Sequence, residues 1–310
     1  MITITVMGST FVRGALLGAA TAAATLGLAG CAGAAPGAPG VVHVVAAENF
    51  WGNITSQIGG RDVEVTSLIT NPNADPHLFE TDAANAATLA EAKVVIENGA
   101  GYDTWMSSLL GADGTSARIV NAAAVLHITG SDPNPHLWYD IPRVPTVAAA
   151  IAAALEKAAP QDTAAFKANL ATFDASLAPL NATLATIKAH FHNVPVGYTE
   201  RVPGYALAVA DLHVATPPGF ARAVEDGSDP SPADTLAMQR LLDDHDINVL
   251  LYNVQTVTPV TTQIRSLARQ HHIPVVGVSE TMPAGVATYQ QWQESQLTAL
   301  LHALTSSRNP

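Results

Sequence analysis

The chain has 310 residues, of which 48% are hydrophobic and 13% are charged, and its formal net charge is -12. An acidic chain with few Lys and Arg residues is a poor nucleic-acid binder, because phosphate contacts need cationic side chains. The single cysteine, Cys31, excludes an internal disulfide framework and any zinc or iron–sulfur site built on several cysteines. The length suits two domains better than one.

Residues 1–30 have the layout of a secretory signal peptide. Arg13 is the only charged residue before an apolar run rich in Ala, Leu and Gly. The run ends in Leu28-Ala29-Gly30-Cys31, which resembles a bacterial lipobox, in which the cysteine is lipidated and becomes the mature N-terminus. The alternative is an ordinary signal peptide with a chance cysteine. Residues 31–40 then form a flexible, lipid-anchored tether, and no second apolar span of membrane length follows.

Short β-rich runs alternate with helical stretches through the rest of the chain. Strands are expected at Val41–Ala46, Val63–Ile69, Lys93–Glu97 and Arg118–Asn121, and again at Val194–Thr199, His213–Thr216, Val249–Tyr252 and Pro274–Val278. This alternation predicts an α/β fold with two lobes, residues 41–160 and 193–310, each with a mostly parallel sheet flanked by helices.

One long helix, residues 161–192, is expected between the two lobes. Its apolar residues alternate spacings of four and three, from Phe166 to Phe191, which is an a/d stripe over four heptads. Pro179 lies inside the helix and should bend it. We interpret the helix as a rigid connection between the lobes; the alternatives are a core helix of one domain and a coiled-coil dimer arm.

Further along the chain, residues 217–232 are expected to form a loop because they are rich in Pro and Gly. Ser231 is expected to cap the next helix, since Pro232 and a carboxylate at Asp234 follow it in the first turn.

Two loops share the pattern Pro-His-Leu, an aromatic residue and a carboxylate. They are Asp75-Pro76-His77-Leu78-Phe79-Glu80 and Pro135-His136-Leu137-Trp138-Tyr139-Asp140. Proline fixes its own φ and favours extended geometry in the residue before it, so each loop presents its imidazole from a stiff backbone. A ligating histidine also needs a partner for its other ring nitrogen. Two matching loops favour a metal site over two unrelated surface loops.

Four metal-capable residues follow predicted strands: His77, His136, Glu200 and Glu280. Ligands of open α/β sheets gather at the carboxyl ends of the strands. Two of the four residues precede the long helix and two follow it, so each lobe contributes two ligands to one cleft. Two imidazoles and two carboxylates can close around one divalent ion without an obligatory water.

Other residues are weaker candidates than these four. His127 is the best substitute ligand, His43 is expected at a core strand position, and Ser279 is the neighbouring alternative to Glu280. Six further histidines lie on expected helices or their ends and are interpreted as surface residues: His190, His192, His245, His271, His272 and His302. The chain contains no metalloprotease, nucleophile-elbow, Walker A or dinucleotide motif. A full set of four protein ligands also argues against a catalytic zinc site, which keeps an open position.

The chain resembles the substrate-binding lipoproteins of ABC importers for manganese and zinc, the metal-binding cluster also called the adhesin-like family. The lipobox and the two Pro-His motifs carry the resemblance, together with Glu97-Asn98-Gly99, Asp229-Pro230-Ser231-Pro232 and Tyr289-Gln290-Gln291-Trp292. It implies two α/β lobes, a long rigid linking helix and a single metal between the lobes. The family's four ligands map onto His77, His136, Glu200 and Glu280.

The resemblance implies an extracytoplasmic solute-binding protein, lipid-anchored to the cell membrane through Cys31 and not an enzyme. Its cargo is one divalent ion, with Mn²⁺ slightly favoured over Zn²⁺ because carboxylate oxygens are hard ligands. Its partner is an ABC permease, and the chain itself is expected to be a monomer. Two alternatives remain open at this point: a secreted metal-dependent hydrolase on a similar scaffold, and an adhesion role that family naming alone suggests.

Overall fold

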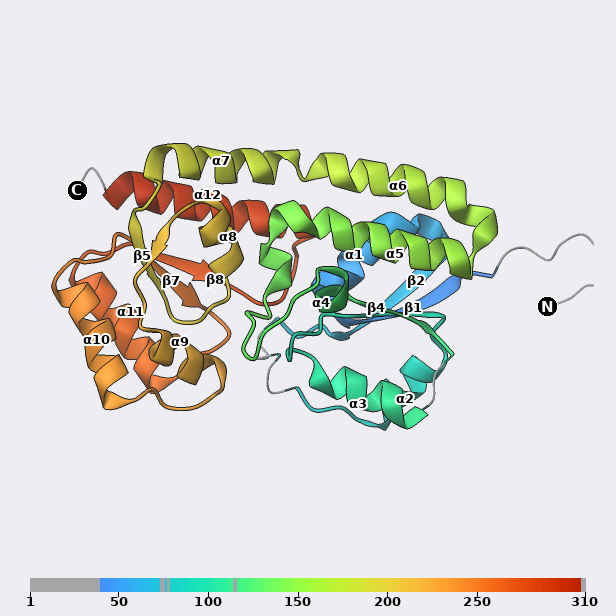
Figure 1. The fold of residues 1–310 in the computed structure, drawn as a ribbon, viewed down its shortest axis with the longest axis horizontal. Helices are drawn as coiled ribbons and strands as arrows, with labels where there is room; N and C mark the ends of the chain where they lie inside the picture. Colours follow the sequence, from blue (N-terminus) through green and yellow to red (C-terminus); the bar gives the residue numbers. More distant parts are fainter. Residues whose placement is uncertain (1–39, 73–75, 77–78, 114–115, 308–310) are drawn as a thin grey trace, which may run out of the picture. The chain divides into compact units, whose positions relative to one another are not determined.

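Each half of the chain builds one four-stranded parallel sheet (Figure 1). The computed structural model describes residues 40–72, 76, 79–113 and 116–307. The expected signal peptide, Cys31 and His77 lie outside the described residues. The first sheet consists of β1 (Val42–Glu48), β2 (Val63–Ile69), β3 (Val94–Glu97) and β4 (Arg118–Asn121), and the second of β5 (Pro195–Tyr198), β6 (His213–Val214), β7 (Leu250–Asn253) and β8 (Val275–Val278).

The strand order is β2-β1-β3-β4 in the first sheet and β6-β5-β7-β8 in the second. All pairs of neighbouring strands are parallel. In both sheets, therefore, the second strand of the sequence lies on one side of the first strand and the later strands on the other. The point where the order reverses is where open α/β sheets bind ligands.

Helices cover both sheets, as buried parallel sheets require. They are α1 (Asn49–Gly59), α2 (Ala83–Ala90), α3 (Thr104–Asp113), α4 (Ala122–Val125), α5 (Val144–Ala158), α6 (Thr163–Ser176), α7 (Ala178–Phe191), α8 (Gly204–Val209), α9 (Pro218–Glu225), α10 (Pro232–Asp243), α11 (Pro259–Gln270) and α12 (Tyr289–Ser307). The expected α/β class, with two parallel sheets and a long connecting helix, is confirmed.

The connecting helix is bent, as the position of Pro179 predicted. Helices α6 and α7 follow one another with a break at Leu177, two residues before this proline. In Figure 1 both helices run along the same side of the two sheets. Helix α6 packs on α1 and α5, and α7 packs on α12 and α8. The apolar stripe faces this core, where Phe166, Leu184 and Ile187 are buried.

The two sheets share one hydrophobic core within the described residues. The ring of Phe50 from α1 stacks on Trp138 at a centroid distance of 4.0 Å and lies 6.2 Å from Trp292 of α12. Tyr289 of α12 donates a hydrogen bond from its hydroxyl to the Trp138 carbonyl at 2.5 Å. Residues from both halves are therefore buried against one another, and no flexible segment separates the sheets where these aromatic rings meet.

Two local predictions were wrong. Residues 218–225, expected in a loop, form α9, because Pro218 starts the helix and Phe220, Ala221 and Val224 bury one face. His43, expected in the core, is on the exposed face of β1. It lies in register with Glu64 of β2, and the two side chains form an ion pair of 3.4 Å.

Candidate metal centre

His136 is held in one orientation by its own loop. The side chain is fully buried. Asn134 Oδ1 lies 2.7 Å from His136 Nδ1 and also accepts a hydrogen bond from the His136 backbone N–H at 3.1 Å. Because an amide oxygen can only accept, Nδ1 carries the proton of this bond and Nε2 presents its lone pair. Trp138 and Tyr102 pack edge-on against the ring at 5.3 and 5.8 Å.

The same loop is tied to the second sheet. Asn134 Nδ2 donates to the Arg201 carbonyl and Tyr205 donates to the Asn134 carbonyl, both at 2.9 Å. The Arg201 guanidinium pairs with Asp132 at 3.1 Å and with Glu225 at 2.7 Å. The hydrogen bond and charge of Glu225 raise the pKa of Arg201. The loop that carries His136 is therefore attached to the residues directly after Glu200.

Glu200 and Glu280 come together through one amide. Glu200 follows β5 and Glu280 follows β8, and both side chains are buried, at 1% and 0% exposure. Asn253, the last residue of β7, donates from Nδ2 to Glu200 Oε2 at 3.1 Å and to Glu280 Oε1 at 2.7 Å. Glu200 and Asn253 lie at the order reversal between β5 and β7.

Glu280 also links the two halves of the chain. Its Oε2 lies 3.5 Å from His136 Nε2 and accepts a hydrogen bond from the Tyr102 hydroxyl at 2.9 Å. Gln255 Oε1 accepts from the backbone N–H groups of Glu280 and Thr281 and fixes the start of this loop. An imidazole nitrogen and two carboxylates thus converge in a buried place, where a divalent cation would offset the cost of burying negative charge.

Three of the four predicted metal ligands lie close together in the structure. His136, Glu200 and Glu280 lie together, while the position of His77 is outside the described residues. His127, the substitute ligand, is exposed at the end of α4. Ser279 accepts a hydrogen bond from Trp292 Nε1 at 3.0 Å and donates to the Thr281 carbonyl, so its side chain serves packing. Among the described residues, no three His, Cys, Asp or Glu side chains already stand in an arrangement that could hold a metal ion.

Sequence reasoning missed the polar residues that orient the carboxylates, Tyr102, Asn253 and Gln255. The sequence did offer a signal for Asn253, since this residue directly follows the expected strand Val249–Tyr252 at the carboxyl edge of the sheet. The sequence offered no such signal for Tyr102, because its contact with Glu280 joins two segments that are far apart in the chain.

A second group of carboxylates lies at the carboxyl ends of β1 and β3. Burial raises the pKa of Glu48 well above its ordinary value, and the charges of Asp103 and Glu97 raise it further. Burial also raises the pKa of Asp103 to about 6, against the lowering effect of backbone N–H donors from Asn98 and Gly99. Burial and the neighbouring carboxylates therefore both favour the protonated form of Glu48.

The comparisons with known proteins agree with this architecture. Residues 44–303 match the family described as zinc-uptake complex component A, periplasmic (ZnuA). The chain belongs to this family, whose members are metal-binding transport proteins. The resemblance drawn from the Pro-His motifs is thereby confirmed.

Two solved structures show the same fold. The periplasmic zinc binding protein TroA from Treponema pallidum has a TM-score of 0.75 and 18% identity, covering 86% of this chain and 99% of TroA. FpvC from Pseudomonas aeruginosa, solved with Mn²⁺, has a TM-score of 0.74 and 21% identity, covering 86% of this chain and 99% of FpvC. At these identities the similarity establishes the fold alone.

Among curated proteins, the manganese-binding lipoprotein MntA of Bacillus subtilis (strain 168) is 30% identical over 135 residues, which is 41% of this chain and 44% of MntA. The chain spans less than half the length of the curated relatives that it matches. In the described part of the chain, no helix combines the length and apolar character needed to cross a membrane.

Proposed function

We propose that this chain is an extracytoplasmic binding protein that captures one divalent transition metal ion, Mn²⁺ or Zn²⁺, and delivers it to an ABC permease. The observation that carries the proposal is the convergence of His136 Nε2 and the Glu280 carboxylate at 3.5 Å, with Asn253 joining Glu280 to Glu200. His77 is the proposed fourth ligand. The names of TroA and MntA, a zinc-binding and a manganese-binding protein, support this cargo class.

Manganese is the favoured cargo. Two buried carboxylates supply hard oxygen ligands, which suit Mn²⁺, while imidazole suits both ions. The general affinity order nevertheless ranks zinc above manganese at N/O sites. The tighter ion in a test tube is therefore not by itself the cargo in the cell. The metal content of protein purified without a His-tag from cells supplied with both ions distinguishes the two.

The chain acts as a carrier without a catalytic step of its own, and as a monomer. Four protein ligands leave no coordination position for a reacting water, which a catalytic metal requires. Nothing among the described residues favours the hydrolase alternative or the adhesion role.

Calorimetric titration with Mn²⁺ and Zn²⁺ tests the ligand set. We expect His77→Ala, His136→Ala, Glu200→Ala and Glu280→Ala each to weaken binding by about 100-fold or more, since even residues that only orient ligands contribute 10–100-fold. The matched control is His127→Ala, which removes an exposed imidazole and should bind like the parent. If Glu280→Ala binds normally, the fourth ligand is misassigned; if both histidine variants also do, the metal centre is elsewhere.

The lipid anchor is a separate part of the proposal. Cys31 at the end of the apolar signal is expected to carry lipid, which the intact mass of the mature protein measures directly. Cys31→Ser should release the protein into the medium or leave the precursor uncleaved. A mature protein whose mass contains no lipid contradicts the anchor without affecting the metal centre.

A further inference from the structure

A cavity of about 1170 Å³ lies along β4, the edge strand of the first sheet, next to α5. It is lined by Val41 and Val42 at the start of β1, by Lys93 just before β3, by β4 and by one face of α5. β1 and β3 contribute their amino ends and β4 its whole length, with Ala124 and Val125 of α4 behind it. None of His136, Glu200 and Glu280 lines the cavity. The cavity is therefore distinct from the proposed metal centre.

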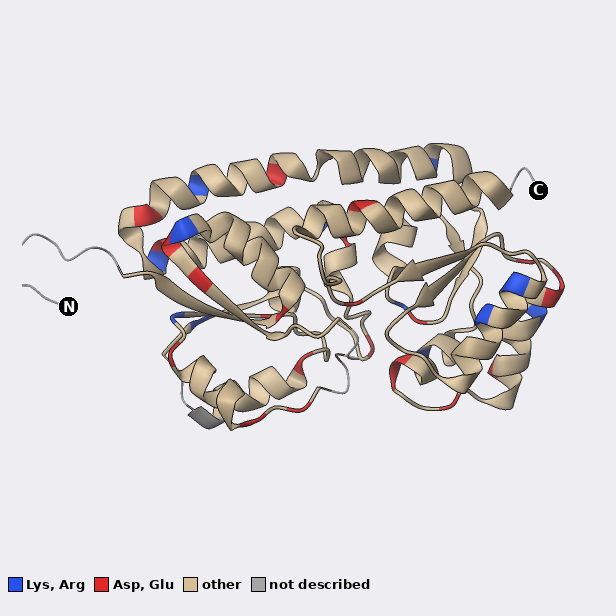
Figure 2. Ribbon diagram, turned by 180° about the vertical axis from the view of Figure 1, so that it is seen from behind, with Lys and Arg blue, Asp and Glu red and all other residues tan. Residues whose placement is uncertain are grey.

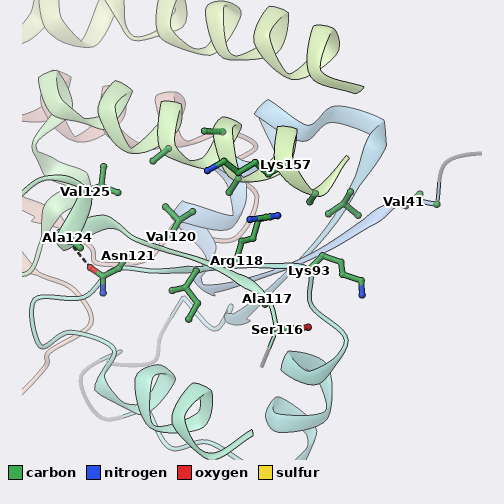
Figure 3. A pocket seen from close by; sticks show the side chains of 17 residues that line it. Val41, Lys93, Ser116, Ala117, Arg118, Val120, Asn121, Ala124, Val125 and Lys157 are labelled. Carbon is green, nitrogen blue, oxygen red and sulfur yellow. Dashed lines mark hydrogen bonds between the residues drawn. The ribbon is translucent and has the colours of Figure 1, made fainter. Parts of the chain in front are cut away.

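Three cations, Lys93, Arg118 and Lys157, line this cavity, and none of its described lining residues is Asp or Glu. Figure 3 shows the Arg118 and Lys157 side chains in the space between β4 and α5, with Lys93 on the other side of the strand. None of the three forms an ion pair with a described carboxylate; Glu156, the neighbour of Lys157, pairs with Lys167 at 3.7 Å instead. Lys and Arg are sparse over the whole molecule (Figure 2), which has a net charge of -12. Three cations without acidic partners in such a chain favour an anionic ligand.

The wall of the cavity is apolar. Val41 and Ile119, two of the exposed large hydrophobic residues of the described chain, are 46% and 48% exposed and both line it. The facing surface of α5 contributes Ala150, Ala153 and Ala154. An exposed apolar surface beside three cations fits an amphipathic anion better than a small inorganic one.

The cavity is also close to the proposed anchor. Gly40 and Val41, the first described residues, line the cavity. Gly40 lies nine residues after Cys31 in the chain. Nine residues span at most about 30 Å, so a lipid at Cys31 keeps the cavity near the membrane surface. Residues 32–40 contain no charged side chain, so the tether cannot neutralise the three cations.

We propose that this cavity binds the phosphate-bearing headgroup of an anionic phospholipid in the membrane to which Cys31 attaches the chain. The proposal rests on the lipid anchor put forward above for its biological setting. Headgroup binding between β4 and α5 uses none of His136, Glu200 and Glu280, so it does not compete with metal binding at the candidate centre.

Vesicle co-sedimentation tests the proposal with the chain beginning at Ala32, which retains the compact unit of residues 39–310. We expect it to bind phosphatidylglycerol-containing vesicles and not pure phosphatidylcholine vesicles. Lys93→Gln, Arg118→Gln and Lys157→Gln together should weaken this binding on the order of a hundredfold, given the usual contribution of each cation at an anionic surface. The matched control combines Lys188→Gln, Arg240→Gln and Arg269→Gln, which removes three positive charges from exposed positions elsewhere and should change binding only a few-fold.

Equal vesicle binding by the two triple variants overturns the proposal, because the net charge of the chain would then be enough to explain the vesicle binding. Displacement of the parent from vesicles by millimolar inorganic phosphate also overturns it, in favour of a site for free anions. Titration with Mn²⁺ separates this inference from the proposed function, since the cavity variant should bind the metal like the parent. Loss of vesicle binding with metal binding intact supports the inference, and the mass at Cys31 reports on the anchor independently.

Discussion

At the scale of single residues, the candidate centre depends on partners that fix its carboxylates and its imidazole. Asn134 determines which nitrogen of His136 presents a lone pair, and Asn253 and Tyr102 fix the orientation of Glu280. A pre-oriented set of this kind reduces the ordering cost of binding an ion. The selectivity of the proposed site therefore depends on these neutral residues as well as on the charged ligands.

Glu48 provides a prediction about stability. Its pKa is raised in the folded chain, so the folded state holds a proton that the unfolded state releases above the ordinary pKa of 4.5. The contribution of Glu48 to folding stability is consequently fully present below its ordinary pKa. It is lost as the pH rises through the raised pKa. Glu48→Gln removes this ionisation, so the variant should melt at least roughly 3 °C higher than the parent at pH 8, the shift that about 1 kcal/mol gives in a chain of this size.

The measurement is thermal unfolding of both proteins at pH 5 and pH 8, with the difference expected to grow with pH. Glu294→Gln is the control, because it neutralises an exposed carboxylate of α12 and should not change the pH dependence. If Glu48→Gln has no higher melting temperature than the parent at pH 8, the pKa of Glu48 is not raised in the folded chain.

At the scale of elements, the capping signal at Ser231 predicted the start of a helix correctly. The loop expected over residues 217–232 was only partly correct, because α9 forms within it. The start of α10 follows the sequence signal, since Ser231 accepts a hydrogen bond from the Asp234 backbone N–H at 3.1 Å. Asp162 lies at the N-cap position of α6, but its side chain makes no capping hydrogen bond. The Pro and Gly residues of 217–232 suggested a loop, yet α9 forms there because its apolar face is buried on the second sheet's cluster.

Ser231→Ala tests the capping contribution. Loss of this hydrogen bond should cost about 1 kcal/mol, equivalent to a melting temperature lower by roughly 3 °C. Ser266→Ala, an exposed Ser→Ala change in the middle of α11 with no capping role, should leave the melting temperature unchanged. Equal effects of the two substitutions would assign the loss to something other than the cap.

At the scale of the whole molecule, the two sheets are joined by a shared aromatic core and by a bent helix packed along its length. Phe50, Trp138 and Trp292 come from three distant segments and are each buried completely or nearly so. Asn49 Nδ2 of α1 donates to the Met282 carbonyl at 3.0 Å, and Met282 N–H donates back to Asn49 Oδ1 at 2.9 Å, close to Glu280 in sequence. Hinged binding proteins instead close through a few flexible residues.

Metal binding should therefore move the sheets little. We expect backbone displacements of about 1 Å or less outside the loops of His77 and Glu280, as is usual for pre-organised partners. Small-angle scattering of the metal-free and Mn²⁺-bound protein should give the same radius of gyration within experimental error. A clear contraction on adding the ion would contradict the rigid connection through α6 and α7.

The sequence by itself determined the element types, the parallel α/β class, the bent connecting helix and three of the described residues that converge, because these depend on local periodicity, capping and the rule that strand ends gather ligands. Only the tertiary structure decided which faces are buried, and so it corrected His43 and the segment of α9. It also brought Tyr102 and Asn253 to Glu280 and assembled the basic cavity from four segments of the chain. Contacts between residues far apart in the chain depend on how strands are ordered and packed, and no local spacing encodes that order.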